Sequence, residues 1–193
     1  MEKIVLASNN QHKVKEFKEI LSNYEILTMK DIGYLDDIEE PGETFAENAL
    51  IKAETIHNYL KEKGLDYIVI ADDSGLCCDA LDGAPGVYSA RYAGEHGNDA
   101  ANREKLRKEL QGKERTACFV CNIIVYYSNG EHKLFEGKTY GTIIDEERGK
   151  KDFGYDCIFL SDELHKTFGE ATEEEKNSVS HRGRAIQKMV KEL

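Results

Sequence analysis

The sequence lacks any long apolar run, and no stretch approaches the roughly 20 residues that a membrane-spanning helix needs. Met1-Glu2-Lys3 leads directly into a short strand-like segment, without the apolar core of a signal peptide. The five cysteines cannot all pair, Cys77 and Cys78 are adjacent, and their spacing is not that of a secreted disulfide framework. We therefore expect an unprocessed, soluble protein of the cytoplasm with no membrane partner.

Positive charge is also scarce. Lys and Arg total 26 against 37 Asp and Glu, which leaves a formal net charge of -11. Because a broad nucleic-acid surface needs a basic footprint, this balance argues against a nucleic-acid polymer as a partner. An acidic protein can still meet a small polyanion locally, through a divalent metal on carboxylates or through a few converging cationic side chains.

Several well-known catalytic motifs are absent. The segment after the first apolar run has no glycine and no GK[ST], so it is not a Walker loop. The six histidines are scattered without an HExxH motif, which argues against a zinc site. Cys118 and Cys121 have CxxC spacing, but they lie in a strand-like segment, where their thiols point to opposite faces. A redox pair needs a helix N-terminus to lower a thiol pKa, so we reject that function.

What is present is an alternation of helical and strand-like segments. At 193 residues, with 40% hydrophobic content, the chain fits a single domain over residues 1–193. The strand-like segments cover residues 3–8, 67–71, 115–127, 132–135 and 139–144, with a hairpin turn at 128–130 and a short strand after 156. Helices are expected after residue 13, over about 44–63, over 98–110 and at the end of the chain. This order predicts an α/β fold with a mixed sheet.

The first candidate site follows the first strand-like run. Small polar side chains lie there between a strand end and a helix start, a geometry that offers backbone N–H groups and a positive helix dipole to phosphates. An ordinary N-cap turn explains the same pattern. The residues are Ser8, Asn9, Asn10, Gln11, His12 and Lys13.

The second candidate site is acidic. Asp72 and Asp73 follow an apolar run and are expected at the carboxyl end of a strand, where open α/β sheets bind ligands. Glu39 and Glu40 precede the Pro41-Gly42 break. Mg²⁺ prefers carboxylate oxygens, water and substrate phosphates, so the two clusters suit it, although most carboxylates of an acidic protein only solvate its surface.

The third candidate site lies near the last helix, where the charges taken alone would suit a solvated helix face and the aromatic segment of residues 153–156 favours a ligand site instead. Its members are Lys176, Ser180, His181, Arg182 and Arg184. The segment Phe153, Gly154, Tyr155 and Asp156 adds an aromatic ring on which a base can stack and a glycine that permits close backbone approach.

Taken in order, these segments resemble the inosine triphosphate pyrophosphatase family, also called Ham1-like or XTP/dITP diphosphatases, and the likeness runs from end to end. Six segments carry it: residues 8–13, Glu39 with 44–53, 71–76, 83–91, 152–156 and 175–183. Many relatives carry glycine where Asn9 stands and proline where Cys157 stands. Asn tolerates left-handed backbone angles, so the first change preserves the turn.

The resemblance implies a fold of two α/β lobes with an elongated mixed sheet flanked by helices, a central nucleotide cleft, and a homodimer. It implies Mg²⁺ held by Glu39 and Asp73, with Asp73 as proton acceptor. It also assigns the purine nucleoside triphosphate to residues 8–13, Lys52, Ser74, 153–156, Lys176, His181 and Arg182. The implied reaction converts noncanonical purine nucleotides such as dITP, ITP, XTP and dXTP to the monophosphate and pyrophosphate.

Two readings compete with this one. A Maf-type pyrophosphatase shares the fold and reaction class but prefers other bases, and its motifs fit less well. A sensor that binds a triphosphate without hydrolysing it would not need the full carboxylate set.

From the residues alone, either Asp72 or Asp73 can accept the proton, because coupled carboxylates titrate as a unit. Donors on Lys176, His181, Arg182 and the backbone near residues 153–156 favour a 6-keto purine.

Overall fold

The computed structural model describes residues 1–193. Its strands are β1 (Lys3–Leu6), β2 (Glu25–Thr28), β3 (Ile68–Cys78), β4 (Thr116–Tyr126), β5 (His132–Ile143) and β6 (Phe159–Ser161). Its α-helices are α1 (Gln11–Ile20), α2 (Phe45–Glu62), α3 (Asp99–Glu109), α4 (Glu173–Val179) and α5 (His181–Val190). Short 3₁₀ helices cover Asp79–Leu81, Gly86–Arg91 and Asp156–Ile158. None of the helices has the length and apolar character needed to cross a membrane.

The strands form one mixed sheet in the order β2-β1-β3-β4-β5-β6. β1 is parallel to β2 and β3, whereas β5 and β6 are antiparallel. The predicted turn between β4 and β5 is present, because the N–H of Tyr127 donates to the carbonyl of Glu131 at 2.8 Å. The α/β prediction with a mixed sheet is confirmed.

The chain divides into two compact units. Unit 1 comprises Met1–Asp73, Asn122–Glu136 and Ala185–Leu193, and unit 2 comprises Ser74–Cys121 and Gly137–Arg184. β3, β4 and β5 each contribute residues to both units. Each unit has its own apolar core, and the single domain over residues 1–193 stays a prediction.

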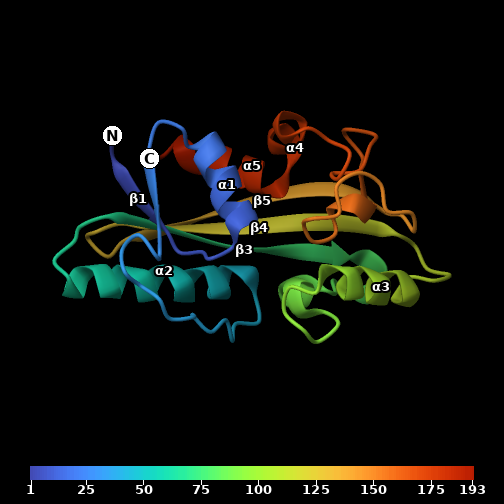
Figure 1. Cartoon of the computed structure of the whole chain (residues 1–193), viewed down its shortest axis with the longest axis horizontal. Coiled ribbons are helices and arrows are strands. Elements are labelled where there is room, and N and C mark those ends of the chain that lie inside the picture. The colour runs from blue at the N-terminus through green and yellow to red at the C-terminus, as the bar shows by residue number, and fades with distance from the viewer. The chain divides into compact units, whose positions relative to one another are not determined.

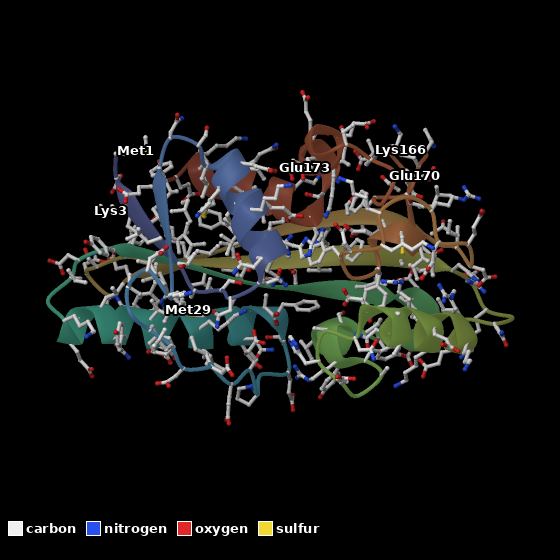
Figure 2. The ribbon with its side chains drawn as sticks, viewed as in Figure 1. Met1, Lys3, Met29, Lys166, Glu170 and Glu173 are labelled. Carbon is white, nitrogen blue, oxygen red and sulfur yellow. The ribbon has the colours of Figure 1, made fainter.

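In unit 1, α1 and α2 lie on opposite faces of the strands (Figure 1). The buried face of α2 includes Ala49, Ala53, Ile56 and Leu60, which recur at helical spacing. These side chains pack with residues of β1, β3 and β4 and with Met29, which Figure 2 shows beside α2. α2 begins at the predicted position because Thr44 and Glu47 form a capping box.

In unit 2, α3 and α4 lie on opposite sides of the strands (Figure 1). Leu106 of α3 packs into a core that includes Phe119 of β4 and Phe159 of β6, whose ring centroids are 4.4 Å apart. Cys157 is buried in the same core, and burial raises the pKa of its thiol. Cys118 and Cys121 are buried cysteines of β4.

Four elements differ from the predictions, and one of them, the strand β2, was not predicted at all. β3 does not end at Ala71 but continues through Asp72 and Asp73 to Cys78, so the acidic pair lies inside the strand. Residues 132–143 form one strand, because its outward-facing polar side chains alternate with buried ones instead of interrupting it. The end of the chain forms two helices, because Ser180 has extended backbone angles and separates α4 from α5.

Candidate active site

The start of α1 is a fully formed N-cap. The side chain of Asn10 accepts hydrogen bonds from the N–H groups of His12 at 3.1 Å and Lys13 at 3.2 Å. The N–H of Asn10 itself donates to Ser8 Oγ at 3.1 Å. The expectation of free N–H groups is therefore wrong for these three residues, because an asparagine at the cap satisfies the first turn from within the chain. The side chains of Asn9, Asn10, Gln11 and His12 are exposed, and Lys13 is partly buried.

Two lysines of unit 1 meet the acidic pair of β3. Lys13 Nζ lies 3.2 Å from Asp72 Oδ2, and the Asp72 side chain is fully buried. Lys52, from α2, donates to the backbone carbonyl of Asp72 and forms a 2.7 Å ion pair with Glu40 Oε1. Burial lowers the pKa of Lys52, but the carboxylates of Asp72, Glu40 and Asp73 outweigh it and leave that pKa raised.

Asp73 is a carboxylate whose protonation is strongly altered in the folded protein. Burial raises its pKa from 3.8 to about 6, against the opposing effects of Lys52 and Lys13. Glu40 and Asp72 add to the rise by repulsion. Asn48 Nδ2 donates to Asp73 Oδ2 at 3.2 Å and orients the group. A buried carboxylate that titrates near neutral pH is suited to accept a proton.

The cluster contains side chains of both charges. Asp72, Asp73 and Glu40 supply three carboxylates, and Lys13 and Lys52 supply two ammonium groups. No group of three or more His, Cys, Asp or Glu side chains is arranged to hold a metal ion by itself. One or two of the carboxylates around Asp73 would fit Mg²⁺, which commonly takes that number of protein carboxylates and completes its shell with water and substrate phosphates.

The two glutamates before Pro41 differ in their surroundings. Glu40 contacts Lys52, whereas Glu39, the predicted metal ligand, is exposed. The sequence analysis included Glu40 in the acidic cluster but assigned the metal to Glu39, because adjacent residues on a loop cannot be told apart by motif spacing. It missed Asn48, whose buried amide joins Gly42 to Asp73.

In unit 2, the predicted cationic residues at the start of α5 are buried. Arg182 is 1% exposed, and its Nη2 donates to Ser74 Oγ at 2.9 Å. The ring of His181 stacks on Phe119 with centroids 4.8 Å apart. Gly183 permits the start of α5 to lie close to α4, because a Cβ there would lie 2.0 Å from the carbonyl oxygen of Asn177. The solvated-face explanation is thus wrong for His181 and Arg182, which lie inside unit 2.

Lys176 connects α4 to the predicted base-binding segment. Its Nζ forms a 2.7 Å ion pair with Asp156 Oδ2 and lies 4.9 Å from the centroid of the Phe153 ring. Phe153 is partly exposed, so one aromatic surface is accessible in this unit. Tyr155, by contrast, is a core residue whose hydroxyl donates to the carbonyl of Ser89 at 2.7 Å. The side chain of Tyr155 therefore anchors residues 153–156 to the core of unit 2.

The backbone of this segment is largely used within the protein. The N–H of Gly154 donates to Asp99 Oδ2 at 3.1 Å, and the N–H of Asp156 donates to the carbonyl of Phe153 at 3.2 Å. These two N–H groups are not available to a purine oxygen, contrary to expectation. The reason is that a glycine with φ of +53° turns the chain tightly enough to bring its neighbours into contact.

A family model described as the Ham1 family matches residues 4–192. The chain belongs to the Ham1 family. This confirms the family that the order of motifs predicts, and the matched range contains every candidate residue of both units.

Similar Ham1 family members include proteins from several bacteria. A Clostridium perfringens protein named dITP/XTP pyrophosphatase is 53% identical over 98% of this chain and 96% of its own length. The structure of the Staphylococcus aureus Ham1 protein has a TM-score of 0.84 with 44% identity, covering 97% of this chain and 96% of that one. A HAM1 protein from Coxiella burnetii has a TM-score of 0.85 with 38% identity, and both chains are fully covered. The ITPase-like fold class is thereby confirmed.

Proposed function

We propose that this chain is a Mg²⁺-dependent pyrophosphatase that hydrolyses noncanonical purine nucleoside triphosphates, dITP or ITP and XTP or dXTP, to the monophosphate and pyrophosphate. The observation that carries the proposal is the lysine and carboxylate cluster around Asp73, in a chain similar over its whole length to proteins named dITP/XTP pyrophosphatase. Removing such nucleotides would cleanse the nucleotide pool.

The proposed reaction is a single displacement at the α phosphorus. Asp73 accepts a proton from water as the water oxygen bonds to the α phosphorus. The bond from that phosphorus to the α–β bridging oxygen breaks, and the electron pair leaves with pyrophosphate. The raised pKa of Asp73, about 6, suits a base that works near neutral pH. Asp72 is the weaker candidate because its side chain is fully buried and paired with Lys13.

Charge on the phosphates is met by the cations of unit 1. Lys13 and Lys52 carry positive charge that can shift from the carboxylates to phosphate oxygens as these arrive. Asp73 with Glu40, or Glu39 as the motif predicts, would hold Mg²⁺. When bound, the ion would supply positive charge that stabilises the negative charge developing on the leaving group.

The base would be recognised by residues of unit 2. Phe153 offers a ring for stacking, and Lys176, His181 and Arg182 offer donors to the 6-keto oxygen of hypoxanthine or xanthine. Adenine presents an amino group at that position, so a buried donor would face another donor at a cost of roughly 1 to 3 kcal/mol. Ser74 would act through Arg182, which it contacts at 2.9 Å.

The deciding experiment incubates the purified protein with dITP and Mg²⁺ in ¹⁸O-labelled water and follows pyrophosphate release. The label is expected in dIMP, because the water attacks the α phosphorus. Label in free phosphate or pyrophosphate would assign the attack to another phosphorus and reject the proposal. Binding of dITP without turnover would identify a sensor instead.

A panel of nucleotides then tests the base preference. We expect dITP and XTP to be cleaved with higher kcat/KM than dGTP, dATP and pyrimidine triphosphates. Preference for a pyrimidine or a modified base would favour the Maf-type function.

We also propose that the protein acts as a homodimer in the cytoplasm. Family membership supports the dimer, and the absence of a disulfide framework in the sequence supports a reducing compartment. Light scattering of the purified protein tests the first point, and fractionation of cells that express it tests the second. A monomer at micromolar concentration would contradict the dimer.

A further inference from the structure

Both peptide groups of Gly154 are held by one face of α3. Asp99 Oδ2 accepts the Gly154 N–H at 3.1 Å, and Arg103 Nη1 donates to the Gly154 carbonyl at 2.8 Å. Asp99 and Arg103 are four residues apart, so they lie one above the other on the same side of the helix. Two bonds to one residue fix the planes of both peptide bonds that flank it.

Arg103 is itself held rigidly. Its side chain is 5% exposed, and its Nε lies 2.7 Å from Glu147 Oε1. Arg107 contacts the same Glu147 oxygen at 3.4 Å, but none of its bonds reaches Gly154. The hydrogen bond from Arg103 is the largest cause that lowers the pKa of Glu147. This carboxylate is therefore ionised at neutral pH and keeps Arg103 in place.

Gly154 lies between the two residues of its segment that face Lys176. The Phe153 ring lies 4.9 Å from Lys176 Nζ on one side of the glycine, and Asp156 pairs with that ammonium group on the other. With φ of +53°, Gly154 sets the direction of the turn that separates them. A change in the orientation of its peptide groups would therefore move the Phe153 ring relative to Lys176 and Asp156.

We propose that Asp99 and Arg103 are positioning residues for purine recognition, which set the Phe153 ring and Asp156 by binding both peptide groups of Gly154. The inference rests on the proposed function for its substrate, a 6-keto purine triphosphate. It gives α3 a role in base selection, although neither side chain needs to touch the nucleotide. A purely structural role would change stability alone.

The experiment compares Asp99→Ala with Asp99→Asn, and Arg103→Ala with Arg107→Ala. Asp99→Ala and Arg103→Ala should raise KM for dITP about tenfold, the effect of one lost charge-assisted hydrogen bond, with kcat changed by less than about threefold. Asn keeps an acceptor oxygen for the Gly154 N–H, so Asp99→Asn should stay within about threefold of wild type. Arg107→Ala removes the same charge from the same helix and should leave KM unchanged.

Amide hydrogen exchange of Gly154 provides a readout that does not depend on turnover. Its N–H should exchange at least about tenfold faster in Asp99→Ala than in wild type or Asp99→Asn. Unchanged KM in Asp99→Ala, or an equal rise in Arg103→Ala and Arg107→Ala, would overturn the proposal. If Arg103→Ala does not fold, the comparison of Asp99→Ala with Asp99→Asn tests the proposal by itself. If the wild type lacks dITP hydrolysis, the proposed function fails, and the purine role fails with it even where the exchange result stands.

Discussion

Lys52 Nζ of α2 lies 2.7 Å from Glu40 Oε1, a residue of the loop that precedes this helix. The loop is tied to the same helix by Asn48, whose Oδ1 accepts the N–H of Gly42 at 2.7 Å. A Cβ at residue 42 would lie 2.6 Å from that oxygen, so only glycine fits this approach. The turn at Pro41-Gly42 thus positions Glu40 beside Lys52 in the cluster around Asp73, while Glu39 is exposed.

Separate substitutions of Glu39 and Glu40 test which of them binds Mg²⁺. Glu39 is the ligand predicted from the motif, and Glu40 is the ligand that the geometry favours. Glu40→Gln should raise the Mg²⁺ concentration needed for half-maximal activity by at least about tenfold, because it removes a charge worth more than 1 kcal/mol in a partly buried cluster. Glu39→Gln should change it by less than about twofold. Activity titrated with Mg²⁺ at saturating dITP measures both, and the reverse result would assign the metal to Glu39.

Asp73→Asn tests the proposed base. The substitution keeps the shape and the acceptor for Asn48 Nδ2 but cannot take a proton, so kcat for dITP should fall by at least about 100-fold. Circular dichroism should show an unchanged fold. Turnover near the wild-type value at saturating Mg²⁺ would remove Asp73 from the mechanism.

The sequence was sufficient where the signal is local. The helix predicted over about 44–63 matches α2, whose capping box of Thr44 and Glu47 and periodic apolar face depend on neighbours within one helix. β3 was ended too early because Asp72 and Asp73 are polar residues that favour turns. Their burial in a strand is made possible by Lys13 and Lys52, which are far away in the sequence.

The same limit applies to the candidate site. The motifs selected Phe153, Gly154 and Lys176, but no local pattern connects Gly154 to Asp99 and Arg103, which are 55 and 51 residues away. Nor does composition show that Tyr155 serves the core while Phe153 stays partly exposed. Such distinctions depend on tertiary contacts that a single sequence does not encode as a pattern.

Arg182→Ala tests how the base is recognised. If the guanidinium group donates to a 6-keto oxygen, the variant should lose dITP turnover by about tenfold to a hundredfold in kcat/KM, and dATP turnover far less. Arg184→Ala is the matched control, because Arg184 lies one turn into the same helix and pairs with Glu163. Equal losses across dITP, XTP, dGTP and dATP would make Arg182 a phosphate or structural contact.

The altered protonation of Asp73 also has a consequence for stability. Its pKa is raised from 3.8 to about 6 in the folded protein, mainly by burial, so folding favours the protonated carboxyl group. The folded state binds this proton more tightly than the unfolded state does. The free energy of unfolding should therefore fall as the pH rises from about 4 to about 6. Above that range the whole loss of stability from ionising the buried Asp73 is present.

Asp73→Asn should consequently make the protein more stable at neutral pH while it abolishes activity. The substitution removes a buried charge whose cost, at 1.4 kcal/mol for each pKa unit, is about 2 to 3 kcal/mol. In EDTA at pH 7.5, a gain of this size raises Tm by several degrees for a chain of this length, and at pH 4 the gain should disappear because the wild-type carboxyl group is then protonated in the folded protein. Thermal unfolding at the two pH values measures the difference. Asp66→Asn, at an exposed position, serves as the control and should show no gain at either pH. A lower Tm for Asp73→Asn at pH 7.5 would mean that the ion pairs of the cluster outweigh the burial of Asp73.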